Sequence, residues 1–213
     1  MSVPSHSSVR LEFGDTKLSL LVYLHGGGFL IKSNFSSTYH THFNAVDAEV
    51  DVVTISINYR FALKHLLPTT YEDSYIAVKW VASHSNGKGP EVLFRDYTNF
   101  DRIFFVGNNA CGNLAHSMAS RVWLEILDSF DLDAIFLNCS YFLGRELKKL
   151  QVKAYVEGIW HYIHLKSTGV DDPLLNPSDR TKPLLQRKDC FVVTKNIGYF
   201  HQQECCVDAS ISG

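Results

Sequence analysis

An alternation of short apolar runs with longer amphipathic segments restricts the fold of this chain more than any other feature. Two runs, 18–24 (LSLLVYL) and 52–57 (VVTISI), are mostly aliphatic or β-branched, and shorter ones follow at 102–106, 134–137 and 190–193. Strands of this composition are typical of a parallel sheet that is covered on both faces. The order therefore predicts an α/β protein with a mostly parallel sheet of about five strands and helices on both faces.

The segments between these runs carry helical periodicity or turn residues. Residues 71–84 and 110–127 repeat apolar side chains at helical spacing, and the second segment has the broader apolar face. Residues 83–98 contain two glycines and a proline, which predicts a loop or a short turn. Residues 144–165 are rich in aromatic side chains and are predicted to be a helical insertion that forms a cap.

The composition is that of one globular domain. The chain has 213 residues, of which 46% are hydrophobic and 20% charged, and this excludes a disordered or low-complexity protein. The net charge of −2 comes without a basic stripe, so nucleic acid is not an expected partner. We expect a single domain over 1–195, with the cap insertion at about 144–165, and a divergent, poorly ordered tail over 196–213.

The apolar pattern predicts neither a membrane span nor a secretory signal. The first residues lack the basic and apolar regions of a leader peptide. The longest apolar stretch, 18–31, is interrupted by His25 and three glycines and is unsuited to crossing a bilayer. We therefore expect a protein of the cytoplasm or the nucleus that does not bind membranes.

The spacings of cysteine and histidine argue against a metal or redox site. The five cysteines are scattered without a C-x-x-C pair, so we expect them to be reduced, buried thiols. The pairs His40/His42 and His161/His164 have no third ligand at a supporting spacing. We expect neither a bound metal nor a cofactor.

A run of three glycines directly follows the first apolar run. The segment reads His25-Gly26-Gly27-Gly28-Phe29. Consecutive glycines let backbone amides converge on a cavity that side chains would otherwise fill, and such amides can hold an oxyanion. A flexible turn is the simpler interpretation of three glycines alone. The preceding histidine and the following aromatic residue favour the lipase and esterase form of the motif.

A second turn is predicted between the third strand and the longest helix, at Gly107-Asn108-Asn109-Ala110-Cys111. A nucleophile elbow of the form G-x-S-x-G would stand here, with its serine at the carboxyl edge of the sheet. Asn109 occupies the serine position, and Cys111 occupies that of the second glycine. A carboxamide is a very poor nucleophile because it is not deprotonated near neutral pH. We therefore expect that no catalytic residue is intact.

Four collinear segments carry a specific resemblance: 22–29 (VYLHGGGF), 58–73 (NYRFALKHLLPTTYED), 79–89 (KWVASHSNGKG) and 169–177 (GVDDPLLNP). Over roughly residues 18–190 the chain resembles the plant carboxylesterases. These belong to the hormone-sensitive-lipase-like group of the α/β-hydrolase superfamily and are related to the gibberellin receptors. The resemblance implies a partial α/β-hydrolase fold, truncated at both ends relative to the family.

The resemblance also assigns roles to individual positions. The amides of Gly27, Gly28 and Ala110 would form the oxyanion hole, and Asn109 would stand in place of the nucleophile. The triad aspartate and histidine are not identifiable, because the tail over 196–213 does not resemble that part of the family. The glycine-run form HGGG favours an esterase ancestor over the receptor form HGGS.

These expectations combine into a carboxylesterase-like protein that is itself a catalytically inactive pseudoenzyme, in a family that hydrolyses carboxylic esters. Two alternatives stay open. One is a binding protein for a small, hormone-like ligand, and the other is a truncated product without a function of its own. A small apolar ester or a hormone-like molecule is the expected ligand.

Several other residues are expected to be structural. Cys111 lies two positions past the elbow apex and is interpreted as a packed thiol rather than a substitute nucleophile. The aromatic residues Tyr155, Trp160 and Tyr162 are expected to pack the cap helix, which in this family also covers the acyl pocket.

Two polar pairs and one strand complete the expectations. Tyr59-Arg60 and Glu72-Asp73 are interpreted as residues that hold the architecture together. The strand 52–57 is expected to lie at an edge of the sheet, where its apolar sequence without lysine or proline favours self-association.

Overall fold

The computed structural model describes residues 17–31, 50–125, 127, 130–138, 142, 158–177 and 189–193. Its elements in chain order are β1 (Leu18–Leu24), β2 (Val52–Ile57), α2 (Thr69–Ala82), α3 (Val92–Tyr97), β3 (Thr98–Asn108), α4 (Ala110–Glu125), β4 (Leu132–Asn138), the 3-10 helix η1 (Gly169–Asp171) and β5 (Asp189–Val193). Residues 158–163 are also helical. Residues 144–157 of the predicted cap insertion and the predicted tail lie outside the described residues.

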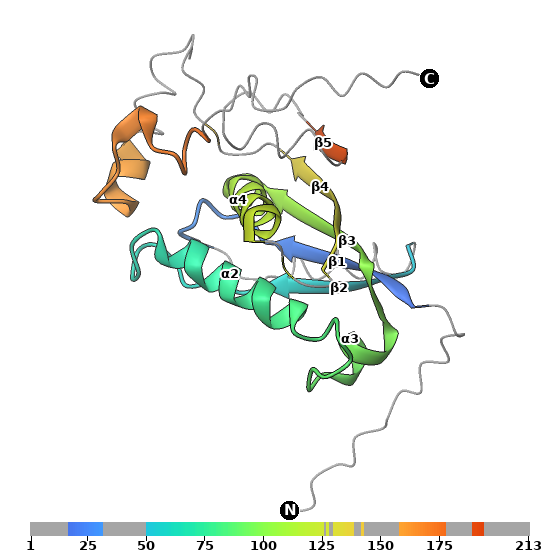
Figure 1. Ribbon diagram of the computed structural model, residues 1–213. Coiled ribbons are helices and arrows are strands. Elements are labelled where there is room, and N and C mark those ends of the chain that lie inside the picture. Colours follow the sequence, from blue (N-terminus) through green and yellow to red (C-terminus); the bar gives the residue numbers. More distant parts are fainter. Residues whose placement is uncertain are drawn as a thin grey trace, which may run out of the picture.

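The five strands form one parallel sheet in the order β2-β1-β3-β4-β5 (Figure 1). The prediction of an α/β fold with a parallel sheet is confirmed. At the carboxyl end of β1, Leu24 pairs with Ile57 of β2 and with Gly107 of β3. The glycine run after β1 and the predicted elbow after β3 therefore leave the sheet at the same edge.

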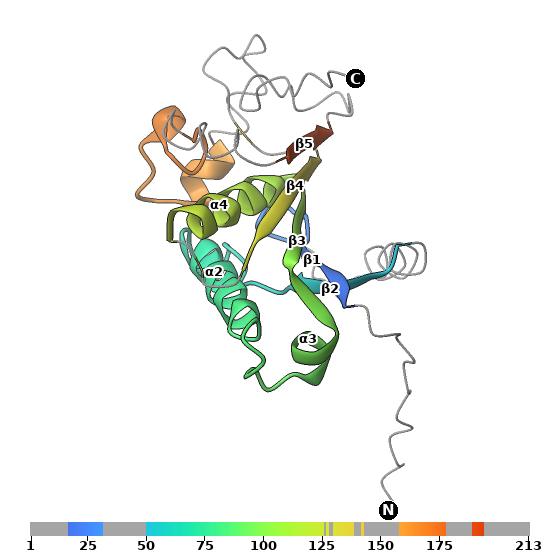
Figure 2. The same ribbon diagram turned by 45° about the vertical axis from the view of Figure 1, so that its right-hand side comes forward.

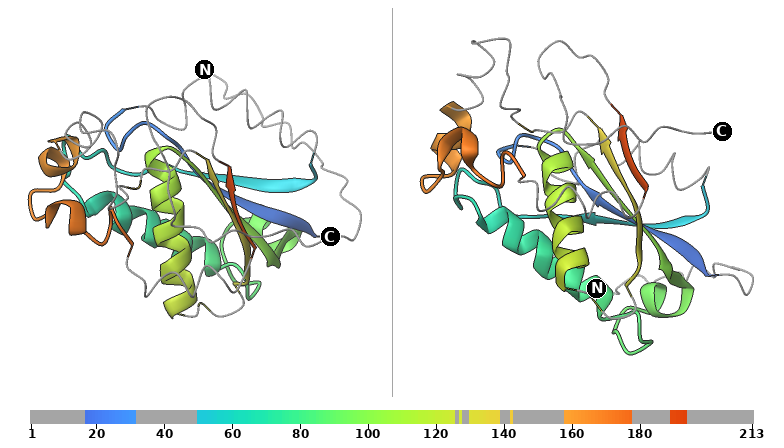
Figure 3. Two further views of the ribbon diagram at one scale, coloured as in Figure 1. Left: turned by 90° about the horizontal axis from the view of Figure 1, so that it is seen from above. Right: turned by 45° about the horizontal axis from the view of Figure 1, so that its top comes forward.

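One face of the sheet is covered by helices. α4 lies against β1, β3 and β4, and α2 lies against α4 on the same side of the sheet (Figures 2 and 3). Val22, Phe105 and Ile135 are register partners across three strands, and each is fully buried. On the opposite face Phe136 is 37% exposed. A helical layer on that second face stays a prediction, since α2 and α4 cover the first face.

β3 and α3 differ from the sequence prediction. β3 begins at Thr98 rather than at residue 102, because Thr98 and Asn99 already pair with Leu18 and Ser19 of β1 ahead of a register shift. α3 lies where a loop or turn was expected. It is only 6 residues long, so it is too short for a helical repeat to show in the sequence.

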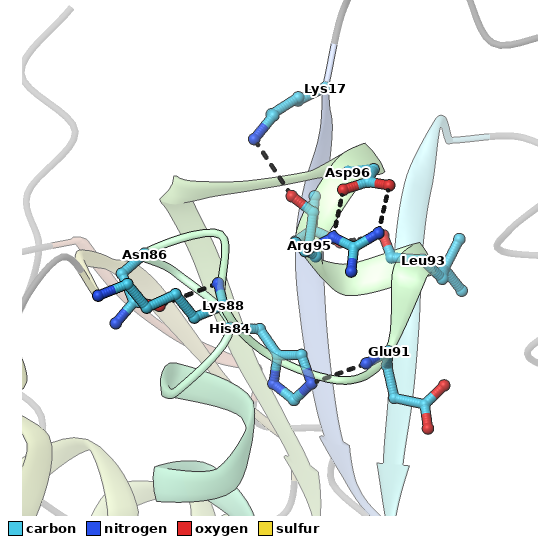
Figure 4. Close-up of polar contacts among 9 residues, drawn as sticks. Lys17, His84, Asn86, Lys88, Glu91, Leu93, Arg95 and Asp96 are labelled. Carbon is cyan, nitrogen blue, oxygen red and sulfur yellow. Dashed lines mark hydrogen bonds and ion pairs between the residues drawn. The ribbon is translucent and has the colours of Figure 1, made fainter.

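His84 joins the end of α2 to the segment that leads into α3 (Figure 4). Its Nε2 accepts the Glu91 amide at 3.3 Å, so Nδ1 carries the proton and donates to the Trp80 carbonyl at 2.9 Å. Phe94 of α3 packs edge-on against the ring, with the centroids 5.5 Å apart. A Cβ on Gly89 would lie 1.9 Å from the ring, so the close passage requires glycine. These contacts hold the segment between α2 and α3 against the end of α2.

Among the strands that the structure describes, β2 and β5 are the two outer ones. The apolar side chains Val53 and Ile57 of β2 point into the core and are 5% and 4% exposed. Within the described ranges, no helix has the length and apolar character needed to cross a bilayer.

Candidate active site

The glycine run after β1 forms a tight turn. Gly27 and Gly28 have φ angles of 139° and 66°, which glycine adopts without strain. The amides of Leu30 and Ile31 both donate to the Gly27 carbonyl at 3.1 Å. Within the described part of the chain, the amides of Gly27 and Gly28 donate to no hydrogen bond. The turn therefore leaves two neighbouring donors available.

Phe29 closes this turn although it is not a glycine. Its φ angle is 66°, in the left-handed region that most side chains avoid. The ring is 1% exposed, and the Phe29 carbonyl accepts the Ala62 amide at 2.9 Å. Burial and this hydrogen bond hold the conformation, so packing fixes the position of the glycine turn.

The turn between β3 and α4 has the backbone of a nucleophile elbow. Asn109 at its apex has a φ angle of 58°, and its amide donates to the Asn138 carbonyl of β4 at 2.9 Å. A Cβ on Gly107 would lie 2.0 Å from the Cys111 carbonyl oxygen. α4 therefore approaches β3 so closely that only glycine fits at 107. The sharp strand-to-helix turn therefore forms with asparagine at its apex.

The side chain of Asn109 is bonded to the next residue. Its Oδ1 accepts the Ala110 amide at 2.6 Å. The family resemblance assigns that amide to the oxyanion hole, where it would donate to a negatively charged substrate oxygen. Here a neutral carboxamide oxygen of the protein itself already occupies the donor.

A buried polar cluster links the glycine turn to the elbow. The Tyr59 hydroxyl donates to the His25 carbonyl at 2.6 Å and lies 2.9 Å from Cys111 Sγ, which also contacts that carbonyl. The rings of His25 and Tyr59 stack with centroids 4.4 Å apart. Burial lowers the pKa of His25. The cluster holds the two turns at a fixed separation.

Cys111 is a structural thiol in this cluster. It is fully buried and not part of a disulfide, as predicted for it. Burial raises the pKa of its thiol to about 12, far above the range in which cysteine acts as a nucleophile. The other cysteines lie outside the described side chains.

Known proteins share both the sequence pattern and the fold of this chain. The sequence matches the family described as alpha/beta hydrolase fold over residues 21–211. The chain belongs to this family. Among solved structures, the esterase Est22 superimposes with a TM-score of 0.67 at 19% identity, covering 85% of this chain and 56% of that one. At this identity the superposition shows a shared α/β-hydrolase fold.

Curated relatives place this hydrolase-family chain beside plant carboxylesterases. Probable carboxylesterase 1 of Arabidopsis thaliana is 38% identical, over 78% of this chain and 54% of that protein. Tuliposide B-converting enzyme 1, amyloplastic, of Tulipa gesneriana is 33% identical, over 81% of this chain and 40% of that protein. The resemblance to plant carboxylesterases is confirmed. The chain spans about half the length of the curated relatives it matches.

The two polar pairs singled out in the sequence do hold elements of this hydrolase fold together. The Arg60 guanidinium lies 2.6 Å from the Asp73 carboxylate, and this contact lowers the pKa of Asp73. Glu72 of α2 lies 3.0 Å from Arg121 of α4. Tyr59 belongs to the buried cluster described above.

Of the predicted cap aromatics, Trp160 packs toward the candidate site. It is 1% exposed, and its ring lies 6.1 Å from that of Phe29. The prediction that Tyr162 also packs is wrong, because its side chain is 66% exposed. Two residues along a helix correspond to roughly 200° of rotation, so the side chains of 160 and 162 point to opposite sides. Tyr155 lies outside the described residues.

The histidine pairs do not form a metal site among the described side chains, in which no group of three potential ligands occurs. His161 is exposed, whereas His164 is buried with Nδ1 3.0 Å from the Asp172 carboxylate. His40 and His42 lie outside the described residues.

Sequence reasoning missed Asn113 and His116 on the helix after the elbow. Asn113 Oδ1 accepts the Tyr71 hydroxyl at 2.8 Å, and its Nδ2 donates to the Leu174 carbonyl at 2.5 Å. Asn113 therefore joins α2, α4 and the segment 169–177. The sequence offered one signal for this contact: the segment 169–177 is among those that carry the family resemblance.

Proposed function

We propose that this chain is a carboxylesterase-family protein that does not hydrolyse esters by a serine mechanism. The observation that carries the proposal is Asn109 at the elbow apex, with its Oδ1 bonded to the Ala110 amide at 2.6 Å. The side chain at this position offers no hydroxyl or thiol to attack an acyl carbon. In a well-studied protease, losing the nucleophile alone lowers turnover on the order of 10⁶-fold.

The same contact also acts against an oxyanion hole, the second part of the family mechanism. An oxyanion hole works when its donors are free and already aimed at the oxygen that becomes charged. Of the three amides assigned by resemblance, Ala110 is engaged by Asn109, and those of Gly27 and Gly28 remain. Reduced stabilisation of a tetrahedral intermediate is therefore expected in addition to the missing nucleophile.

Binding of a small apolar ester or hormone-like ligand is a second candidate function. It is favoured by the free amides of Gly27 and Gly28, which could donate to a ligand carbonyl, and by the aromatic pair Phe29 and Trp160 beside that turn. Binding needs donors and an apolar wall but no nucleophile.

Ester hydrolysis tests the first proposal. We expect purified chain and p-nitrophenyl butyrate to give no burst of p-nitrophenol, and no turnover that an organophosphate blocks. Heat-denatured chain serves as the blank, and an active serine esterase as the positive control. A burst proportional to protein concentration and abolished by the organophosphate would contradict the proposal.

Ligand binding is tested separately on the same preparation. Titration with an uncleaved analogue, the methyl ketone that matches p-nitrophenyl butyrate in chain length, should change the tryptophan fluorescence if Trp160 borders an acyl pocket. A matched Trp160→Phe variant should lose that change. An unaltered spectrum at millimolar ketone would remove binding as a candidate function.

Self-association and location in the cell remain proposals. β2 at the sheet edge is the strand through which copies of this chain would pair. Light scattering at tens of micromolar should then show a dimer or larger species, and a clean monomer would contradict it. The tulip relative is named as an amyloplast protein, whereas we expect this chain in the cytoplasm or nucleus.

A further inference from the structure

An asparagine followed by a glycine lies in the turn between α2 and α3. Asn86, Gly87 and Lys88 are all exposed. Gly87 has a φ angle of 76°, and a Cβ built on it would meet nothing within 4 Å. Solvent therefore reaches both the carboxamide of Asn86 and the peptide unit that follows it.

The carboxamide of Asn86 is turned towards the main chain that follows it. Its Oδ1 accepts the Lys88 amide at 3.1 Å (Figure 4). Because Oδ1 is bonded to Cγ, the carboxamide carbon also lies on this side of the backbone. A bond between Cγ of Asn86 and the nitrogen of Gly87 would close a five-membered ring, and only rotations about χ1 and ψ of Asn86 are needed to bring the two atoms together.

We propose that Asn86-Gly87 is a site of spontaneous deamidation. The Gly87 nitrogen loses its proton to solvent base and attacks Cγ of Asn86, which forms a C–N bond and closes a succinimide ring. The bond from Cγ to Nδ2 breaks, and Nδ2 takes a proton from water and leaves as ammonia. Water then opens the ring at either carbonyl, so that position 86 becomes aspartate or isoaspartate. Water is the only other reactant.

The contact with Lys88 favours this attack. In the tetrahedral intermediate the negative charge develops on Oδ1 of Asn86, and the Lys88 amide already donates to this oxygen. A backbone donor in such a position stabilises the developing charge as the donors of an oxyanion hole do. The glycine at 87 also leaves the attacking nitrogen without a neighbouring side chain in its path.

One other contact opposes the attack. The Gly87 amide donates to the His84 carbonyl at 3.1 Å, and its proton must leave before the nitrogen reacts. This hydrogen bond lies in an exposed turn, where backbone hydrogen bonds open at a low cost in free energy. The reaction therefore proceeds from the opened turn, and its rate depends on how often the turn opens.

Deamidation changes both the charge and the length of the turn. The net charge goes from −2 to −3, because a neutral carboxamide becomes a carboxylate. In isoaspartate the main chain runs through Cβ and Cγ, so it is one carbon longer ahead of Gly87. The His84 ring accepts the Glu91 amide at 3.3 Å and lies against Gly89. An added carbon between 84 and 89 therefore shifts the segment that leads into α3.

Incubation of the unmodified full chain at mildly alkaline pH tests the proposal. Trypsin cleavage after Lys79 and Lys88 releases residues 80–88, in which Asn86 is the one asparagine and no aspartate occurs. This peptide should gain the mass difference between a hydroxyl and an amino group, and an isoaspartyl methyltransferase should methylate it. Conversion should be slower at mildly acidic pH, because the attacking nitrogen must lose its proton. An unchanged peptide, or equal conversion at both pH values, would overturn the proposal.

Asn99 is the matched control within the same chain. Its Oδ1 accepts the Asp101 amide at 2.9 Å, the same contact two residues along the chain. The next residue, however, is the buried Phe100, and the backbone lies in β3. We expect conversion at Asn86 to be at least about tenfold faster than at Asn99. Equal rates would show that the open turn and its glycine do not promote the reaction.

A variant and a denatured sample separate the folded turn from the bare sequence. Asn86→Gln would have to close a six-membered ring, so its peptide 80–88 should contain no isoaspartate. Isoaspartate in that variant would show that the signal does not come from Asn86. Conversion confined to the chain unfolded in urea would also overturn the proposal, because the folded turn would then protect Asn86.

Discussion

The glycine turn and the turn after β3 stand side by side at the carboxyl ends of β1 and β3, yet they differ in how far they match the esterase motifs that the resemblance assigns to them. The glycine turn keeps the residue types of an esterase, with left-handed conformations at Gly28 and Phe29. The elbow keeps only the backbone. Asn109 holds a φ angle of 58° in place of the serine. Backbone geometry and chemical competence are therefore separable at this site.

The physical reason lies in what supports each turn. The elbow depends on the close approach of α4 to β3 at Gly107, and that approach does not involve the apex side chain. Asparagine is among the few residues besides glycine that tolerate the left-handed region. An asparagine at the apex is therefore compatible with this turn at little cost to the fold.

The largest effect is expected at the support of the elbow. In Gly107→Ala the new Cβ would lie 2.0 Å from the Cys111 carbonyl oxygen, which is backbone and cannot rotate away. We expect a loss of about 3 kcal/mol in the free energy of unfolding, at the upper end of overpacking effects. Urea denaturation measures it.

Gly158→Ala is the matched control, since its Cβ would meet nothing within 4 Å in a helical segment. It should be neutral or stabilising by up to about 1 kcal/mol. Equal losses at 107 and 158 would show that close packing does not support the elbow.

Acid should also lower the free energy of unfolding, because His116 lies buried on α4, the helix that follows the elbow. Burial lowers the pKa of His116 from 6.5 to about 4. As the pH falls from 6.5 towards 4, the unfolded chain takes up a proton that the folded chain does not, so the folded state loses stability. A shift of this size corresponds to a loss on the order of 3 kcal/mol, complete below about pH 4.

His116→Phe isolates this contribution. Stability of the variant should fall less between pH 7 and pH 4.5 than that of the unmodified chain, and thermal melts across this range measure the difference. Parallel curves for the two proteins would mean that His116 does not titrate in this way.

The glycine turn should be less sensitive to a methyl group than the elbow. Gly28 has a φ angle of 66°, but a Cβ there would meet nothing within 4 Å. Gly28→Ala should therefore cost only the left-handed strain of about 1–2 kcal/mol. Urea denaturation beside Gly107→Ala compares the two turns directly, and a larger loss at 28 than at 107 would reverse our interpretation of their supports.

The sequence predicts some elements of this fold better than others. β1 and β2 have the predicted bounds, because each is a continuous apolar run that ends at polar or turn residues. β3 was predicted too short, since its first residues are polar and join the sheet only through pairing with β1. A helix as short as α3 carries no periodic signal.

The positions of both turns at the candidate site were likewise predictable, because glycine runs and elbow spacing are local patterns. The engagement of the Ala110 amide by Asn109 was not, since it depends on a side-chain rotamer. A small cavity beside His116 is lined by α4 and by residues 173–177, which are far apart in the sequence. Contacts of this kind arise from packing between segments, which no local pattern reports.

The smallest effect is expected for Asn109→Ser, which gives the elbow the serine of the motif and so removes its main difference from the glycine turn. The serine restores a hydroxyl and frees the Ala110 amide, but the hydroxyl needs a base to accept its proton and a carboxylate to orient that base. Among the described histidines, His25 stacks on Tyr59 and His164 lies against Asp172. We expect turnover of p-nitrophenyl butyrate to stay at background.

Asn109→Ala is the control for this prediction, because it also frees the Ala110 amide and adds no nucleophile. The ratio of the two variants therefore reports the serine hydroxyl alone. Turnover by Asn109→Ser that exceeds this control by roughly a hundredfold, the lower end of what a positioned general base contributes, would show that a base reaches the elbow. The elbow would then lack only its nucleophile, and its divergence from the glycine turn would rest on a single side chain.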